Sequence, residues 1–201
     1  PSASRPGRSP CHADDRAALG HRRLSVLDLV TGAQPMRDAG GRYHIVYNGE
    51  IYNFLELRAE LAARGVAFRT RSDTEVILEL FAWEGAAALQ RLNGMFALAI
   101  WDGVARRLFL ARDRLGVKPL FYAVRGAELV FASELKALLL HPAVGRRLRR
   151  SALPKYFALG YIPAPETIFE GVYKLEPGGF LEWHERGFKV GQYWDLPAAA
   201  A

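Results

Sequence analysis

The sequence predicts an α+β fold in which antiparallel sheets are covered by helices. Short runs of β-branched, aromatic and aliphatic residues recur on either side of turn signals and alternate with segments of helical periodicity. The runs 95–101 and 108–112 are apolar at almost every position, so we expect both faces of their sheet to be covered. With 201 residues, of which 50% are hydrophobic, the chain can bury a core of its own.

The strands are expected where short apolar runs flank turn signals. Residues 43–47 (Tyr-His-Ile-Val-Tyr) form a β-rich run that ends in the turn signal Asn48-Gly49. Three hairpins are predicted from pairs of such runs, namely 95–101 with 108–112, 120–124 with 128–132, and 172–175 with 180–184 around Pro177-Gly178-Gly179.

The helices are expected where capping residues precede apolar residues at helical spacing. Asn53 with Glu56, and Ser72 with Glu75, have the spacing of a capping box, in which two side chains satisfy free N–H groups of the first turn. Five helices are predicted, between Asn53 and Gly65, Ser72 and Gly85, Ala86 and Leu92, Ser133 and Leu140, and Ser151 and Gly160.

The positive charge of the chain is concentrated in one stretch. The formal net charge is +6, and residues 141–155 supply five of these charges, from Arg146, Arg147, Arg149, Arg150 and Lys155. A local arginine cluster beside helices is typical of a solvated face or of a contact with another domain. A nucleic-acid groove instead interleaves aromatic and basic residues along a surface. We therefore expect no nucleic-acid partner.

Composition also argues against membrane and metal-dependent classes. No apolar run approaches the roughly 18–20 residues that cross a bilayer, and residues 1–16 lack the apolar block of a signal peptide. The one cysteine, Cys11, excludes an internal disulfide framework and suits the reducing cytoplasm. The five histidines show no metal-ligand spacing, so we expect no metal site and no cofactor in this chain.

Three short polar clusters stand beside apolar segments, at 20–26, 47–53 and 71–75. In the first, Arg23 can form a bidentate pair with a carboxylate, although an exposed arginine pair is the simpler explanation for that cluster alone. In the second, the Asn48 amide and the Gly49 N–H can converge as an oxyanion hole requires, or can form a plain hairpin turn. In the third, Ser72 and Glu75 cap a helix while Asp73 remains free for a ligand ammonium. Together these groups suit an α-amino acid with a reactive side-chain carbonyl.

At these residues the sequence closely resembles the glutaminase domain of asparagine synthetases, which are class II glutamine amidotransferases of the N-terminal-nucleophile hydrolase type. Six blocks match in family order: Gly-His-Arg-Arg-Leu-Ser-Val at 20–26, Val-Tyr-Asn-Gly-Glu-Ile-Tyr-Asn at 46–53, Arg-Ser-Asp-Thr-Glu at 71–75, Leu-Asn-Gly-Met-Phe-Ala at 92–97, Ala-Arg-Asp-Arg-Leu-Gly-Val-Lys-Pro-Leu-Phe-Tyr at 111–122 and Phe-Ala-Ser-Glu-Leu-Lys-Ala-Leu at 131–138. The resemblance runs from about residue 19 to residue 195.

The resemblance implies a four-layer αββα sandwich that hydrolyses glutamine to glutamate and ammonia. It assigns the glutamine carboxylate to Arg23 with the Leu24 and Val26 backbone, the α-ammonium to Glu50 and Asp73, and the oxyanion to Asn48 and the Gly49 N–H. It also implies that ammonia passes to a C-terminal synthetase domain, where Mg-ATP activates aspartate, and it leaves a homodimer open as an assembly.

The sequence departs from the family at both ends. The family nucleophile is an N-terminal cysteine in a Cys-Gly-Ile context, whereas Cys11 lies in Pro-Cys-His-Ala, only twelve residues before Arg23. The resemblance therefore divides the chain into an irregular start (1–16), an amidotransferase domain without its first strands (17–190) and a linker (191–201) toward a synthetase domain absent from this sequence. We expect this chain alone not to hydrolyse glutamine, because removing a nucleophile costs about a millionfold in rate.

Two alternatives to the glutamine-hydrolysing half of an asparagine synthetase stay open at this point. One is the amidotransferase half of a related enzyme that transfers ammonia to another acceptor. The other is a non-catalytic module in which a glutaminase fold supports a partner domain. The residues that the resemblance assigns to glutamine are present, and the expected nucleophile is not, so the sequence alone does not separate these alternatives.

Overall fold

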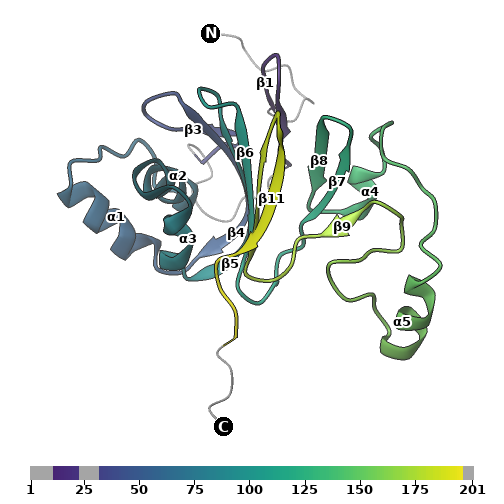
Figure 1. Cartoon of the computed structure of the whole chain (residues 1–201). Helices are drawn as coiled ribbons and strands as arrows, with labels where there is room; N and C mark the ends of the chain where they lie inside the picture. The colour runs from purple at the N-terminus through teal and green to yellow at the C-terminus, as the bar shows by residue number, and fades with distance from the viewer. Residues whose placement is uncertain (1–10, 23–31, 197–201) are drawn as a thin grey trace.

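The computed structural model describes residues 11–22 and 32–196. Within these ranges two antiparallel sheets pack against each other, and helices lie on the outer face of each sheet (Figure 1). The larger sheet has six strands in the order β11-β10-β6-β5-β4-β3, and the smaller has three in the order β8-β7-β9. The order of layers is helix, sheet, sheet, helix, which confirms the predicted αββα sandwich.

The larger sheet consists of β3 (Met36–Arg37), β4 (Tyr43–Ile51), β5 (Gly94–Asp102), β6 (Arg107–Arg112), β10 (Gly179–His184) and β11 (Gly187–Gln192). The smaller sheet consists of β7 (Phe121–Arg125), β8 (Glu128–Ala132) and β9 (Tyr173–Lys174). The larger sheet is covered by α1 (Phe54–Ala63), α2 (Asp73–Glu84), the 3-10 turn η1 (Gly85–Ala87) and α3 (Ala88–Arg91). Two short helices, α4 (Leu135–Leu138) and α5 (Ala152–Leu159), lie on the side of the smaller sheet.

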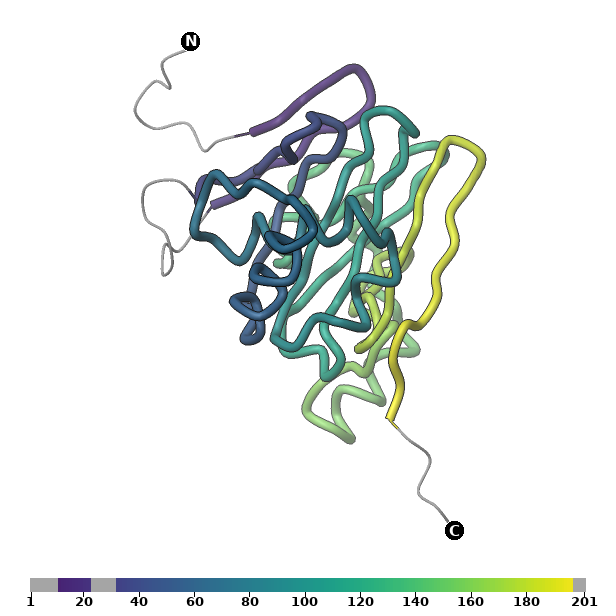
Figure 2. The backbone as a smooth tube through the Cα atoms, turned by 90° about the vertical axis from the view of Figure 1, so that its left-hand side faces the viewer, coloured from purple at the N-terminus to yellow at the C-terminus, as the bar shows by residue number. Residues whose placement is uncertain are grey.

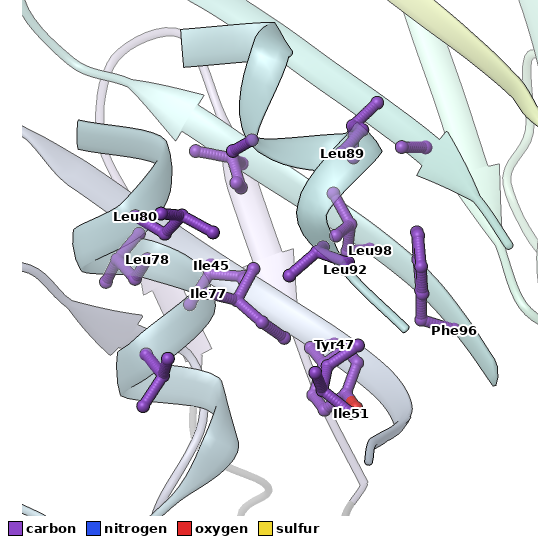
Figure 3. Close-up of a cluster of buried hydrophobic side chains, with 14 of the residues drawn as sticks. Ile45, Tyr47, Ile51, Ile77, Leu78, Leu80, Leu89, Leu92, Phe96 and Leu98 are labelled. Atoms are coloured by element: carbon purple, nitrogen blue, oxygen red, sulfur yellow. The ribbon is translucent and has the colours of Figure 1, made fainter. Parts of the chain in front are cut away.

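Alternation along β4 and β5 separates two of the hydrophobic cores. Ile45, Tyr47 and Ile51 of β4 pack with α1, α2 and α3 (Figure 3), whereas Val46 faces the smaller sheet. On β5, alternate residues divide between the same two cores, with Phe96, Leu98 and Ile100 toward the helices and Ala97, Ala99 and Trp101 toward the smaller sheet. The prediction that both faces of this sheet are covered is therefore confirmed.

A short hairpin of β1 (Cys11–Ala13) and β2 (Ala18–Gly20) lies beside the larger sheet (Figure 2). The Trp101 Nε1–H of β5 donates to Asp14 of this hairpin at 2.8 Å, and the rings of His12 and His44 stack 3.7 Å apart. Strand β1 lies in the stretch that the sequence led us to expect as irregular. The hairpin ends at Gly20, which brings residues 20–22 to the edge of β4.

Two of the three predicted hairpins are confirmed, as β5–β6 and β7–β8. The third is wrong, because β9 pairs with β7 in the smaller sheet, whereas β10 pairs with β6 and β11 in the larger sheet. The turn at Pro177-Gly178-Gly179 moves the chain from one sheet to the other, and the Gly178 N–H donates to the Asp113 carbonyl at 2.8 Å. Strand β10 thus pairs with the distant β6 and with β11, which follows it directly, and not with β9 across the turn at 177–179.

The capping predictions are confirmed in part. Ser72 is the N-cap of α2, since its hydroxyl accepts the Thr74 N–H at 3.2 Å. Glu75 does not return to Ser72, because its carboxylate accepts the N–H groups of Arg69 (2.9 Å) and Thr70 (2.7 Å). Asn53 caps no N–H of α1 and instead pairs with the backbone of residues 91 and 93. Among the described residues, none of the helices has the length and apolar character of a membrane span.

Candidate active site

A cavity of about 790 Å³ lies where the edge of β4 meets the smaller sheet. All six sequence blocks that carry the family resemblance contribute to its lining. The lining residues from these blocks are Gly20, His21 and Arg22; Val46 to Glu50; Ser72 to Thr74; Met95 and Ala97; Lys118 and Leu120; and Phe131 to Glu134 with Lys136 and Ala137. Segments more than one hundred positions apart in the sequence therefore meet at one place.

The outer edge of β4 presents three N–H groups toward this cavity region. The Tyr52 N–H donates to the Asn93 carbonyl (2.7 Å), so the even-numbered N–H groups of the ladder face β5 and the odd-numbered ones face the other edge. The Tyr47 N–H donates to Gln34 Oε1 (2.6 Å), and the Ile51 N–H donates to Asp73 Oδ2 (3.2 Å). The Gly49 N–H, between them, meets no acceptor within residues 11–22 and 32–196.

Gly49 is required by the close approach of β4 to β5. A Cβ atom at this position would overlap the Met95 carbonyl oxygen and lie 2.7 Å from Phe96 Cα. Gly49 and Phe96 form a non-hydrogen-bonded cross-strand pair, the closer of the two kinds of pair in an antiparallel ladder. The same glycine thus allows the tight pairing and leaves one backbone N–H directed to the open edge.

Asp73 is held at the beginning of α2 and lines the cavity. Its Oδ2 accepts the Tyr47 hydroxyl (2.9 Å) and the Ile51 N–H, while among the described residues Oδ1 accepts only the Ser72 hydroxyl, at 3.4 Å. Asp73 therefore has partners inside the chain, and those partners engage mainly one of its two oxygens. Because a carboxylate oxygen can accept two hydrogen bonds, Oδ1 retains capacity for a donor from the cavity.

Burial and the Asp73 carboxylate both raise the pKa of Tyr47 far above its ordinary value. The Tyr47 hydroxyl therefore stays protonated and donates to Asp73 throughout the physiological range. This bond fixes Asp73 to the same strand that carries Gly49. Tyr47 therefore links the Asp73 carboxylate to a position two residues from Gly49 on β4. This link determines where the carboxylate lies relative to the Gly49 N–H.

Asn48 and Glu50 alternate with Tyr47 and Ile51 along β4, so they lie on the face that carries the cavity. The Glu50 side chain makes no hydrogen bond or ion pair with the residues that the structure describes. The structure thus brings four of the predicted site residues together, namely Asn48, Gly49, Glu50 and Asp73. Arg23, Leu24 and Val26 lie outside the described residues.

The opposite side of the cavity is shaped by the loop that follows β6. The buried Asp113 carboxylate accepts four N–H groups, from Phe96 (3.2 Å), Leu115 (3.1 Å), Val117 (2.9 Å) and Lys118 (2.9 Å). The Arg112 guanidinium binds the carbonyls of Lys118 (2.7 Å), Leu175 (2.7 Å) and Gly116 (2.6 Å). These contacts fix the backbone of Lys118, which lines the cavity.

Lys118 and Gln34 are two of the lining residues that were not singled out from the sequence. Lys118 lies inside the block at 111–122, so the resemblance offered a signal, but no local pattern marks it. Gln34 carries no signal in the sequence, because its role depends on where β3 begins. Among the described residues no group of three His, Cys, Asp or Glu side chains could hold a metal ion.

Cys11 is exposed on β1, where it pairs with Gly20, and it is not among the residues that line the cavity. The polar groups of the cavity are instead carboxylates, amides, the open Gly49 N–H and the cations of Arg22, Lys118 and Lys136. This set can bind a zwitterion with a polar side chain by complementary charges.

Comparison with known proteins agrees with this picture. The family described as a glutamine amidotransferase domain matches residues 5–194. Asparagine synthetase (glutamine-hydrolysing) 3 of Bacillus subtilis is 42% identical over 194 residues, which cover 95% of this chain and 32% of that protein. A protein of Mycobacterium tuberculosis named putative asparagine synthetase (glutamine-hydrolysing) is 46% identical over 181 residues, which cover 84% of this chain and 28% of that protein. The chain thus spans about a third of the length of these curated relatives.

A solved structure supports the fold. The glutamine phosphoribosylpyrophosphate amidotransferase of Bacillus subtilis superposes with a TM-score of 0.60 at 24% identity, covering 88% of this chain and 35% of that one. At this identity the likeness concerns the fold alone, and it agrees with the αββα sandwich of the N-terminal-nucleophile hydrolase type.

Proposed function

Because the chain belongs to the glutamine amidotransferase domain family, we propose that its cavity binds glutamine and serves the glutamine-hydrolysing half of an asparagine synthetase. Ammonia released from glutamine would amidate aspartate in a C-terminal domain that uses Mg-ATP. The single observation that carries this proposal is the convergence of all six sequence blocks on one cavity with an acidic wall and an open backbone N–H. Residues 17–190 form the amidotransferase domain in this proposal, and 191–201 lead toward the second domain.

The charges of glutamine match the groups at the cavity. The α-ammonium lies between Glu50 and Asp73 Oδ1, two acidic positions of the lining with unused acceptor capacity. The side-chain carbonyl oxygen lies at the Gly49 N–H and the Asn48 amide. Arg23, with the backbone of Leu24 and Val26, binds the α-carboxylate as the resemblance implies. The reducing cytoplasm suits a chain with one cysteine and no disulfide.

The open Gly49 N–H favours amide hydrolysis over simple binding. When a thiolate adds to the side-chain carbonyl carbon, the C=O electron pair moves to oxygen, and a donor already aimed at that oxygen stabilises the new charge. One such donor lowers the barrier by about 3–4 kcal/mol. The proton that a base takes from the thiol passes to the amide nitrogen, so that collapse of the adduct expels ammonia and leaves a thioester. Water then cleaves the thioester to glutamate and restores the thiol.

Glutamine binding tests the proposal on the chain itself. We expect L-glutamine to shift the amide NMR signals of residues 48–51 and 73 in a saturable way, whereas glutaramate, which lacks the α-ammonium, binds at least roughly tenfold more weakly because it loses charged hydrogen bonds. Saturable shifts confined to other surfaces, or equal affinity for the two ligands, would contradict the proposed site.

Cys11 offers a second, smaller test. Because Cys11 is exposed on β1 and does not line the cavity, we expect no glutamate formation from glutamine by this chain, and an identical result for Cys11→Ala. Glutamate is measured by a coupled dehydrogenase assay. Glutamate formation that Cys11→Ala abolishes would show that Cys11 is the nucleophile and would require a different arrangement of the site.

A further inference from the structure

In the part of the chain that the structure describes, side chains rather than a strand lie against the outer edge of β4 beyond Ile45. Strand β3 pairs with β4 only at Ile45 and His44, and beyond that point no described strand continues the ladder on this side. The next outward N–H groups belong to Tyr47, Gly49 and Ile51, at intervals of two residues. Two of them have side-chain acceptors, and the middle one does not.

We propose that Gln34 is a positioning residue for the Gly49 N–H, which it holds toward the cavity by binding the neighbouring Tyr47 N–H. This inference rests on the proposed function of the cavity. Gln34 is only 4% exposed, and its Oε1 accepts the Tyr47 N–H at 2.6 Å. Its Nε2 lies 3.4 Å from the Thr74 hydroxyl, so both ends of the amide are engaged.

A side-chain acceptor has a consequence here that a strand would not have. A longer β3 would present a carbonyl to every second N–H of β4, and the Gly49 N–H would then be consumed by the sheet. Of the three outward N–H groups, Gln34 accepts only that of Tyr47, and Asp73 accepts only that of Ile51. The outer edge of β4 is therefore fixed on both sides of Gly49, and the Gly49 N–H stays available for an oxyanion.

Both acceptors are tied to the same turn of α2. Asp73 is the first residue of the helix, and Thr74, the partner of Gln34, follows it directly. The Ser72 cap holds that turn by accepting the Thr74 N–H. A shift of Gln34 would consequently release the Tyr47 N–H on one side of Gly49, while the Tyr47 hydroxyl and the Ile51 N–H stay bound to Asp73. With its backbone held on one side only, the peptide that carries the Gly49 N–H would rotate.

The test compares two replacements of similar size in the 201-residue chain. Gln34→Met has a similar size and offers only a weak thioether acceptor, whereas Gln34→Glu retains an acceptor oxygen in either protonation state. Gln90→Met, at an exposed position on α3, is the matched control. Amide hydrogen exchange of Tyr47, Gly49 and Ile51 is measured without ligand, and the glutamine-induced shift of the Gly49 amide is measured with L-glutamine.

We expect Gln34→Met to accelerate exchange of the Tyr47 amide at least roughly tenfold, since its only acceptor is lost, and to reduce the glutamine-induced Gly49 shift. Gln34→Glu and Gln90→Met should retain both properties. If Gln34→Met and Gln34→Glu behave alike at Gly49, the inference is overturned. A merely structural role would lower stability in Gln34→Met without moving the Gly49 signal, which also overturns it.

The unmodified chain supplies a measurement that needs no variant to fold. A scalar coupling across the hydrogen bond from Tyr47 N to the Gln34 side-chain carbonyl carbon is expected, together with slow exchange at Tyr47 and Ile51 and fast exchange at Gly49. Absence of the coupling, or slow exchange at all three amides, refutes the inference. If glutamine fails to bind while these ligand-free results hold, the proposed function fails and the edge arrangement stands.

Discussion

Two buried aspartates on either side of the cavity differ in how fully their oxygens are used. Asp113 is 1% exposed and accepts two N–H groups on each oxygen, so its four acceptor positions are filled by backbone. Asp73 is 4% exposed and fills only Oδ2, since Oδ1 has one long contact to Ser72. Asp73 lines the cavity and Asp113 does not. The number of donors on each oxygen therefore separates a carboxylate that holds a loop from one that can still take a ligand.

The largest effect is expected for Asp113→Asn. An asparagine oxygen can accept two of the four N–H groups, but its NH₂ then opposes the other two inside the protein. Each buried donor left without an acceptor costs about 1–3 kcal/mol, so the free energy of unfolding should fall by about 2–6 kcal/mol. Urea denaturation followed by tryptophan fluorescence measures this loss.

Asp15→Asn is the control for this prediction, because its side chain is 73% exposed. We expect it to change the free energy of unfolding by less than about 0.5 kcal/mol. If Asp113→Asn is equally mild, the four short contacts do not hold the loop, and the contrast with Asp73 is lost.

Asp73→Asn should weaken glutamine binding strongly and lower the free energy of unfolding only slightly. The asparagine oxygen can replace Oδ2 and retain the bonds from the Tyr47 hydroxyl and the Ile51 N–H, so stability should fall by only about 1 kcal/mol. The NH₂ that replaces Oδ1 repels an ammonium, and the loss of one charged hydrogen bond corresponds to about 1.5–3 kcal/mol, roughly 10–150-fold in glutamine affinity. NMR titration measures the affinity, and urea denaturation measures the stability.

Glu134→Gln is the matched control, since Glu134 also lines the cavity but is exposed and pairs with Lys136 at 2.8 Å. Its glutamine affinity should stay within roughly twofold of the unmodified chain, because that exposed pair contributes little. An Asp73→Asn chain that binds glutamine normally but is as unstable as Asp113→Asn would show that both aspartates serve the fold only.

The sequence predicted those parts of the fold and site that local contacts determine. The β5–β6 and β7–β8 hairpins and the Ser72 cap each depend on residues a few positions apart, and all three are confirmed. The local β10–β11 hairpin was not recognised from its turn at residues 185–186, and the pairing of β10 with β6 was missed because β6 lies about seventy positions earlier in the sequence. A local turn signal carries no information about such a pairing.

The site follows the same division. Asp73 was recognised from its cluster, but its bond to the Tyr47 hydroxyl joins residues 26 positions apart and could not be inferred from spacing. Gln34 was missed because an amide in a loop has no periodicity, and its contact with Tyr47 depends on β3 beginning only at Met36. Residue type thus predicted which groups are present, whereas the unused acceptors and donors emerged only from the packing.

Two glutamates one turn apart on α2 extend the comparison to a smaller effect. Burial would raise the pKa of Glu75, but hydrogen bonds from Arg69 and Thr70 outweigh it and lower that pKa. Glu79 has one such bond, from the Ala39 N–H at 3.1 Å, and burial followed by the nearby Asp38 and Glu75 raises its pKa above the ordinary 4.5. The donor count that distinguishes Asp113 from Asp73 thus also sets the direction of these two pKa shifts.

Glu79→Gln should therefore stabilise the fold at neutral pH, by less than the two aspartate effects. A raised carboxyl pKa means that the native state holds its proton to higher pH than the unfolded chain, so Glu79 lowers stability as pH rises from 4.5 through the native pKa. The glutamine side chain keeps a carbonyl for Ala39 and carries no charge. The stability gained by the variant should be near zero at about pH 4 and larger at about pH 7 in urea denaturation. A gain that is equal at both pH values would mean that packing rather than the buried charge of Glu79 is responsible, and donor count would then not explain its pKa.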